Sequence, residues 1–300
     1  MIFLNRYPRL ISAVFLCCVG PGLPVITHAA EMVRAEPVAI PALRQSHSRG
    51  WEVVESPNFR FFHQKQSALV TRLAKLCEES RTVIRDRWLG SAAKQTWVIK
   101  CDVYLYAVAA DFQRQTRCPA DTLGVADLEI GEGKVWKRRV YLRSDHEACL
   151  AVIGVHELAH VILAERFTQR QIPRWADEGI ALNSEPLSRQ QDTRRWLAAE
   201  VRQGRGFTLF QLISMRQLPQ DKLWGDLFYA QSGSLIEYLL SQNSNSEEAV
   251  LQIVESWQQQ GPDQSSQRAT LAKLEAEWKA WLLKSDATGE SGRQVAADRP

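Results

Sequence analysis

The chain lacks the features that mark a nucleic-acid-binding protein, a membrane span or a cysteine-rich zinc site. Lys and Arg number 37 against 34 Asp and Glu, and so small a surplus gives no reason to expect nucleic acid as a partner. Its most apolar stretch, near the N-terminus, is broken at Gly20, Pro21, Gly22 and Pro24, short of the roughly 18 apolar residues that a span needs. There is also no C-x-x-C pair, which argues against a Cys-rich zinc site.

The first thirty residues instead have the order of a secretory signal peptide. Arg6 and Arg9 form a basic start, Leu10 to Val19 is apolar, and Ala29 and Ala30 are small residues suited to cleavage. An uncleaved membrane anchor is the alternative. We expect residues 1–30 to be removed, no stable membrane span to remain, and the protein to be secreted or to lie in the periplasm or cell envelope.

Four cysteines remain after the signal, and an even number in an exported chain suggests two disulfides. Three pairings are possible, and we favour Cys77–Cys101 with Cys118–Cys149. Each would close a loop of about 25–30 residues and stabilise the fold by roughly 3–4 kcal/mol. Buried free thiols are the alternative.

The pattern along the chain predicts an α+β fold, a small mixed α/β half followed by a mainly helical half. Residues 31–49 are rich in Pro, Ala, Ser and Arg and are expected to be a linker. Residues 50–284 form the expected domain, divided into 50–143 and 144–284, and 285–300 form a flexible tail. With 45% hydrophobic residues, the chain can build one good core or two small subdomains.

Local periodicity places the elements. A hairpin is expected over Trp51–His63 with its turn at Ser56–Asn58, and strands over Trp97–Ala107 and Lys134–Leu142. Glu132 lies in a turn between Gly131 and Gly133, because a lone G-x-G is more often a turn than a phosphate site. Helices are expected, in chain order, at 67–88, 109–115, 144–166, 174–182, 189–203, 226–241, 246–258 and 267–283, with a Ser144–Glu147 capping box opening the third.

The stretch Val155–Val161, VHELAHV, places three costly polar groups in an apolar helix. His156 and His160 are four residues apart, so both project from one helix face and can bind one zinc ion. Glu157 lies about 100° around the helix, where it can hold and deprotonate a metal-bound water. Two core histidines bonded to backbone groups are the alternative reading.

A catalytic zinc needs a third protein ligand. Glu178 lies in RWADEGIA, residues 174–181, on a short helix after Pro173. Its apolar neighbours, among them Trp175 and Ile180, indicate a buried helix face. Asp177 points about 100° away from Glu178, so only one of these two carboxylates can face the metal.

The two motifs together, HELAH followed by WADEGIA, resemble the gluzincin zinc metallopeptidases and, more closely, the bacterial peptidase MA-like proteins. The resemblance spans roughly Trp51 to Leu283. It implies one Zn²⁺ bound by His156, His160 and Glu178, with Glu157 as general base. It also implies an edge strand at Lys134–Leu142 that binds extended substrate.

The resemblance further implies a tyrosine that stabilises the oxyanion, and Tyr229 is our candidate, with a packed core tyrosine as the alternative. Arg174 could be an electrostatic stabiliser or a surface residue. Gluzincins of the thermolysin type place an acid one turn after the third ligand, where this chain has Leu182. Asp177 or Asn183 could replace it.

These observations predict an exported zinc metallohydrolase that acts on a peptide or protein substrate. An amidase acting on envelope peptides and a catalytically inactive, zincin-like binding or scaffold protein are the alternatives. The intact Glu157 counts against the last, because a structural metal site needs no base.

Overall fold

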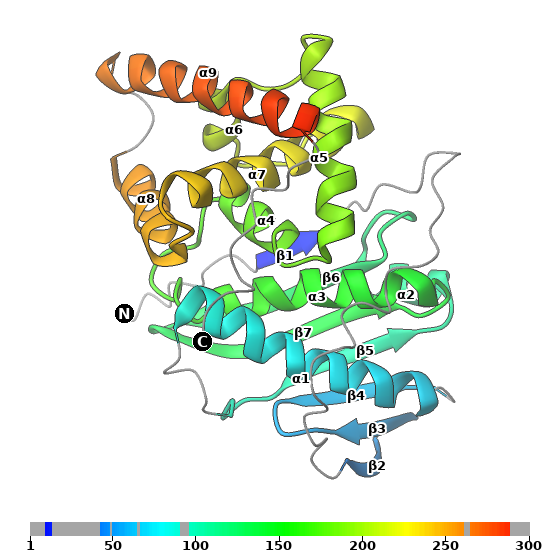
Figure 1. Ribbon diagram of the computed structural model, residues 1–300. Helices are drawn as coiled ribbons and strands as arrows, with labels where there is room; N and C mark the ends of the chain where they lie inside the picture. The colour runs from blue at the N-terminus through cyan, green and yellow to red at the C-terminus, as the bar shows by residue number, and fades with distance from the viewer. Residues whose placement is uncertain are drawn as a thin grey trace, which may run out of the picture. The chain divides into compact units, whose positions relative to one another are not determined.

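The computed structural model describes residues 10–13, 43–48, 50–64, 67–90, 96–260 and 265–288. It confirms the predicted fold class: an N-terminal sheet with helices is followed by a mainly helical C-terminal half (Figure 1). Contacts along the chain divide it into two units, Met1–Gln171 and Ile172–Pro300. The helix that carries HELAH belongs to the first unit and the WADEGIA segment to the second.

The first unit is built on one sheet, which has seven strands in the part of the chain that the structure describes. Their order is β1-β6-β7-β5-β4-β3-β2. Strand β4 pairs with β5 and β5 with β7 in parallel, and the other neighbours are antiparallel. The bounds are β1 Leu10–Ala13, β2 Arg44–Ser48, β3 Trp51–Glu55, β4 Phe59–His63, β5 Cys101–Tyr106, β6 Gly124–Gly131 and β7 Lys134–Arg143.

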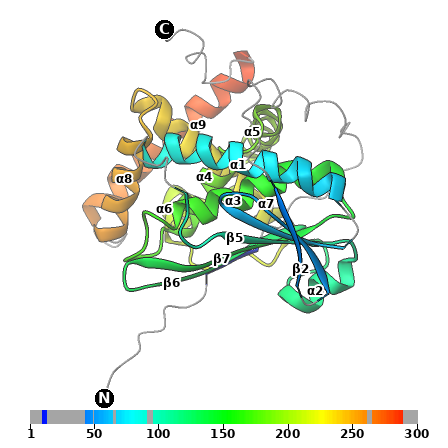
Figure 2. The same ribbon diagram turned by 90° about the horizontal axis from the view of Figure 1, so that it is seen from below.

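Three helices accompany this sheet: α1 (Ser67–Leu89), α2 (Ala109–Thr116) and α3 (Glu147–Leu163). Helices α1 and α3 lie against each other and cover one face of the sheet (Figures 1 and 2). The opposite face carries a cross-strand row of rings, in which Tyr104 stacks on Phe62 at 4.4 Å and on Tyr141 at 5.3 Å. Phe112 of α2 packs against Tyr106 on this second face. Side chains alternate between faces along a strand, so the sheet is apolar on both sides.

The predicted hairpin Trp51–His63 is confirmed as β3 and β4. Strand β5 starts at Cys101, later than predicted, because the backbone N–H of Trp97 bonds the side chain of Asn58 at 2.8 Å instead of a neighbouring strand. The edge position implied for Lys134–Leu142 is wrong. Strand β7 lies between β6 and β5, and Lys137 pairs with Asp127 of β6 at 3.0 Å.

Three strands fall where the sequence suggested none: β1, β2 and β6. Strand β1 lies inside the expected signal segment and pairs antiparallel with β6, Leu10 facing Leu128. Strand β2 lies inside the expected linker and pairs with β3. Both are edge strands of the sheet. Short polar edge strands such as RQSHS carry little periodic hydrophobic signal, which is why β2 escapes a pattern search.

Ser144, the predicted N-cap, is not where α3 (Glu147–Leu163) begins. The N-cap of α3 is His146, with no side-chain capping bond. The backbone N–H of Ser144 instead donates to the carbonyl oxygen of Tyr106 at 2.9 Å. The Arg143 guanidinium binds both carboxylate oxygens of Asp145, at 3.1 and 2.7 Å, and the Ala120 carbonyl at 2.7 Å. The turn into α3 is therefore fixed by the end of the sheet.

The second unit is helical throughout its described secondary structure. Five of its helices match the predicted segments to within a few residues, and a sixth, α6, was not predicted. The bounds are α4 Arg174–Leu182, α5 Leu187–Arg202, α6 Leu209–Ser214, α7 Lys222–Gln242, α8 Glu247–Gln260 and α9 Ser265–Thr288. Of the predicted tail, residues 289–300 lie outside the described part.

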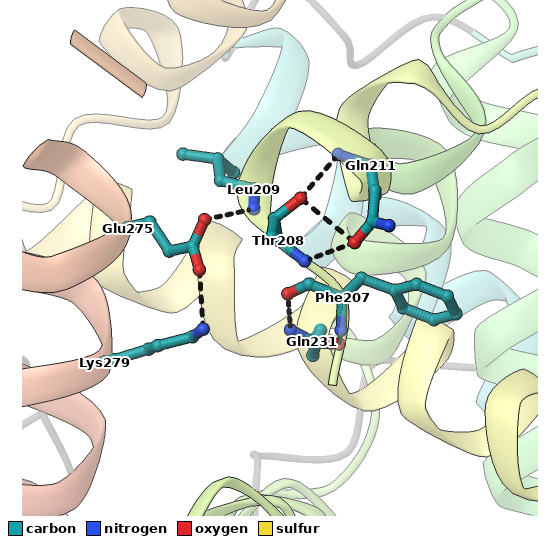
Figure 3. Close-up of polar contacts among 7 residues, drawn as sticks. All are labelled: Phe207, Thr208, Leu209, Gln211, Gln231, Glu275 and Lys279. Atoms are coloured by element: carbon teal, nitrogen blue, oxygen red, sulfur yellow. Dashed lines mark hydrogen bonds and ion pairs between the residues drawn. The ribbon is translucent and has the colours of Figure 1, made fainter. Parts of the chain in front are cut away.

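Polar side chains of α7 and α9 hold the start of α6 (Figure 3). The buried Gln231 amide on α7 accepts from the Phe207 N–H at 2.7 Å and donates to the Phe207 carbonyl oxygen at 3.0 Å. Glu275 on α9 accepts from the Leu209 N–H at 2.7 Å. Thr208 and Gln211 form a capping box. A helix of six residues has little stability of its own, so these contacts define it.

Cys77, Cys101 and Cys118 carry free thiols in this structure. The expected bridges Cys77–Cys101 and Cys118–Cys149 are therefore not formed here. Free thiols, the alternative, are what the structure shows for these three cysteines, and the Cys149 side chain lies outside the described part. Burial raises the pKa of the Cys101 thiol, and the neighbouring Cys77 raises it further.

Within the described residues, no helix is both long enough and apolar enough to cross a bilayer.

Candidate metal centre

Helix α3 presents three polar side chains of HELAH in a buried setting. His156 and Glu157 are 0% exposed and His160 is 2% exposed. Val155, Leu158, Ala159 and Val161 around them are buried as well, and burying these apolar side chains stabilises the helix at the cost of enclosing the polar ones. The two imidazole rings lie 5.0 Å apart, centroid to centroid, with their planes at 71°.

The predicted ligand set comes together. One donor atom from each of His156, His160 and Glu178 lies within 4.8 Å of the other two, and all three residues are buried. Two imidazole nitrogens and one carboxylate oxygen are the donor set of mononuclear zinc hydrolases, which leave a fourth position open. This donor set fits a divalent cation.

Glu157 is not part of that set. It follows His156 directly, so its side chain points about 100° away from that ligand around the helix. Its side chain lies over Gly124, the first residue of β6. A Cβ atom at position 124 would be 3.2 Å from Glu157 Cγ and 3.1 Å from Leu142 Cδ2, and it would overlap Ile153. Only glycine leaves room for the Glu157 side chain here without movement of these neighbours. No local sequence pattern links this glycine to the site.

Glu178 owes its place to the packing of α4 on α7. Helix α4 begins at Arg174, with Pro173 as its N-cap. Proline lacks a backbone N–H and breaks the interior of a helix, so it favours a helix start at this point. A Cβ at Gly179 would lie 2.5 Å from the Ser232 carbonyl oxygen of α7, so the two backbones touch at the residue after the ligand. Asn183 fixes the end of α4, because its side-chain amide donates to the carbonyl oxygens of Gly179 and Gly233, at 2.8 Å each.

Asn183 thereby links α4 to α7, and its suggested part beside the metal stays a prediction. Leu182, which stands where thermolysin-type enzymes have an acid, packs on α7: a Cβ at Gly233 would be 3.3 Å from it. Asp177 is buried, at 4% exposure.

Arg174 is not a surface residue. Its side chain is 17% exposed, and its Nε lies 3.5 Å from Glu178 Oε1, one helical turn away. This distance is long for a hydrogen bond but within range of an ion pair. Among the predicted ligands, Glu178 thus has a cation beside it within its own helix.

Tyr229 lies on α7 and is 7% exposed, with its ring in edge contact with Phe228 at 5.9 Å. Its proposed part in catalysis stays a prediction. Cys118 is a residue that sequence reasoning did not connect with the site. Burial raises the pKa of its thiol, and the Glu157 carboxylate contributes to the same shift, so Cys118 lies within the electrostatic field of the candidate base.

No protein-family model matches this chain, and no curated protein matches it. The likeness to gluzincins accordingly rests on the two short motifs and remains a prediction.

Proposed function

We propose that this protein is an exported zinc-dependent metallohydrolase, and specifically a peptidase. The observation that carries the proposal is the buried cluster of His156, His160 and Glu178, with Glu157 enclosed on the same helix and outside the ligand set. A structural zinc site would close all four positions with protein ligands and has no use for an additional buried carboxylate.

Each residue has a distinct part in the proposed reaction. His156, His160 and Glu178 would hold the ion. Zinc, when bound, supplies a Lewis acid that lowers the pKa of water and polarises a carbonyl group. The Glu157 carboxylate accepts the proton of the attacking water and returns it to the leaving nitrogen. Enclosure of Glu157 strengthens its electrostatic interaction with the reacting atoms, because little solvent screens it.

The substitution Glu157→Gln tests the proposal. We expect it to retain one zinc per chain, since the amide keeps the shape and Glu157 is not a ligand, and to lower the rate of peptide hydrolysis by about a hundredfold or more. Zinc content is measured by elemental analysis, and turnover with unfolded casein and with peptidoglycan-derived peptides as separate substrates.

His160→Ala is the companion variant, expected to lose both zinc and turnover. Hydrolysis confined to the peptidoglycan peptides would favour the amidase alternative. Zinc binding without hydrolysis of either substrate in the wild-type protein would favour the scaffold. Full activity of Glu157→Gln would refute the general-base role.

Tyr229 is proposed as the donor that stabilises the oxyanion. If so, Tyr229→Phe should retain zinc and leave KM little changed while kcat falls by about 10²–10³-fold. Tyr238→Phe, on the same helix and also buried, is the control and should keep its activity. Equal activity of Tyr229→Phe and wild type would assign Tyr229 to packing alone.

A further inference from the structure

We infer that Arg174 is a positioning residue for the third ligand: its guanidinium holds the Glu178 carboxylate in the orientation in which it binds the metal. This inference rests on the proposed zinc site. It is drawn from the ion pair of 3.5 Å between Arg174 Nε and Glu178 Oε1, with Glu178 fully buried and Arg174 largely so.

Helix energetics do not explain an arginine at this position. Arg174 is the first residue of α4, and a cation at a helix N-terminus opposes the helix dipole. A charged pair four residues apart also favours the order with glutamate first, whereas here arginine precedes glutamate. The local helix would be better served by a neutral or acidic residue, so the reason for Arg174 lies in what it contacts.

That contact is a carboxylate with no exposed surface. A buried carboxylate is costly to ionise unless a cation accompanies it, and a metal ligand must be ionised. Arg174 supplies this cation. It also orients the carboxylate, because the guanidinium is planar and holds a carboxylate in a defined plane.

Close contacts hold the backbone beside Glu178, so the side chain remains to be positioned. Gly179 touches the backbone of α7 at Ser232, and Asn183 bonds carbonyl groups on both helices. With the Cα of Glu178 held in this way, its side-chain torsions decide where the carboxylate lies. Partners that orient metal-ligating carboxylates change metal affinity by about 10- to 100-fold when they are removed.

The sign of the effect separates positioning from simple charge. If Arg174 were only a nearby positive charge, it would repel the metal ion, and its removal would tighten zinc binding. If it orients Glu178, its removal weakens zinc binding in spite of the relieved repulsion. Zinc affinity of the full-length protein, measured by competition with a chromophoric chelator, therefore decides between the two.

The chain offers a matched control in Arg189 of α5. Arg189 Nε lies 3.9 Å from Glu185 Oε2, and that glutamate side chain is 1% exposed. This pair is also an arginine and a buried glutamate four residues apart, and Glu185 does not belong to the metal cluster. Arg189→Gln should thus lower the stability of the fold as the loss of any such ion pair does, without changing the affinity for the metal.

We expect Arg174→Gln to raise the zinc dissociation constant about tenfold or more, while Arg189→Gln stays within about twofold of wild type. Arg174→Lys should fall between Arg174→Gln and wild type, because lysine retains the charge but not the planar group. With cobalt in place of zinc, the visible spectrum of Arg174→Gln should shift toward that of Glu178→Ala, while the spectrum of Arg189→Gln should match wild type.

Zinc binding by Arg174→Gln that equals or exceeds wild type would overturn the inference, as would an equal loss in Arg189→Gln. If Arg174→Gln does not fold, Arg174→Lys decides: weaker zinc binding than wild type supports positioning, and unchanged binding refutes it. The zinc site itself is judged separately. It fails if wild type binds no zinc or if Glu178→Ala binds it as well as wild type does.

Discussion

At the scale of single residues, the site depends on small groups as much as on its charged ones. His156, Glu157, His160 and Glu178 follow from a four-residue helical spacing and a motif eighteen positions downstream, so their types and positions could be read from the sequence. Gly124 could not. It lies on β6, far from HELAH in the sequence, and its importance arises from contact between this strand and the Ile153 and Glu157 side chains of α3.

Gly124→Ala should therefore impair catalysis without removing the metal. The added methyl must displace Ile153 and Glu157, and a shift of about 1 Å in a catalytic group can cost about a hundredfold in rate. We expect kcat/KM to fall by about tenfold or more, with one zinc retained, as judged by elemental analysis.

Gly154→Ala on α3 is the control for this prediction. A Cβ there makes only ordinary contacts, 3.5 Å from Leu73 Cδ1 and 3.9 Å from Leu142 Cδ1. Alanine also favours a helix by about 1 kcal/mol over glycine, so activity should be kept and stability should not fall. Matching losses in both variants would attribute the Gly124 effect to general damage of the fold.

At the scale of elements, long amphipathic helices could be predicted from the sequence. Short helices and helix ends that depend on residues distant in the sequence could not. Helices α1 and α4 are indicated by apolar spacing and by Gly90 or Pro173 at one end, and α7 by apolar spacing alone. Helix α6 depends on bonds from Gln231 and Glu275, both distant in sequence. The start of α3 was misassigned for the same reason: Arg143, Asp145 and the Tyr106 carbonyl decide it, whereas a capping box considers only adjacent residues.

The Arg143–Asp145 pair makes the β7–α3 connection sensitive to acid. Hydrogen bonding from Arg143 lowers the pKa of Asp145 below its ordinary value. A lowered folded-state pKa stabilises the native state above the unfolded-state pKa of about 4, and this contribution is lost as pH falls through the folded-state value. Asp145→Asn should be less stable than wild type at neutral pH, and the difference should shrink below about pH 4.

Denaturant unfolding of the metal-free proteins across that pH range measures the difference. Asp192→Asn serves as the reference, because the Asp192–Arg195 pair is exposed, with side chains 40% and 68% accessible, and exposed pairs contribute little. A stability difference for Asp145→Asn that does not change with pH would show that the Arg143 contact acts through shape and not through charge.

At the scale of the whole molecule, the sequence predicted a sheet-bearing first half and a helical second half because hydrophobic periodicity changes from two to about 3.6 along the chain. It did not yield the strand order. The parallel neighbours β4, β5 and β7 are joined by long connections, and β6 reverses to pair with β7, which places β7 inside the sheet. Such pairing depends on contacts between remote segments, and no local pattern encodes them.

The contact between Gln231 and Phe207 has a chemical consequence of its own. One residue, Phe207, offers both its N–H as a donor and its carbonyl oxygen as an acceptor, and the Gln231 side-chain amide bonds to both. A glutamate of the same length could accept but not donate when ionised, and a leucine could do neither. The amide can also serve in one orientation only, since turning it over would bring two donors together on one side and two acceptors on the other. The neighbouring Gly206, with φ of 142°, lets the chain approach closely enough for this double recognition.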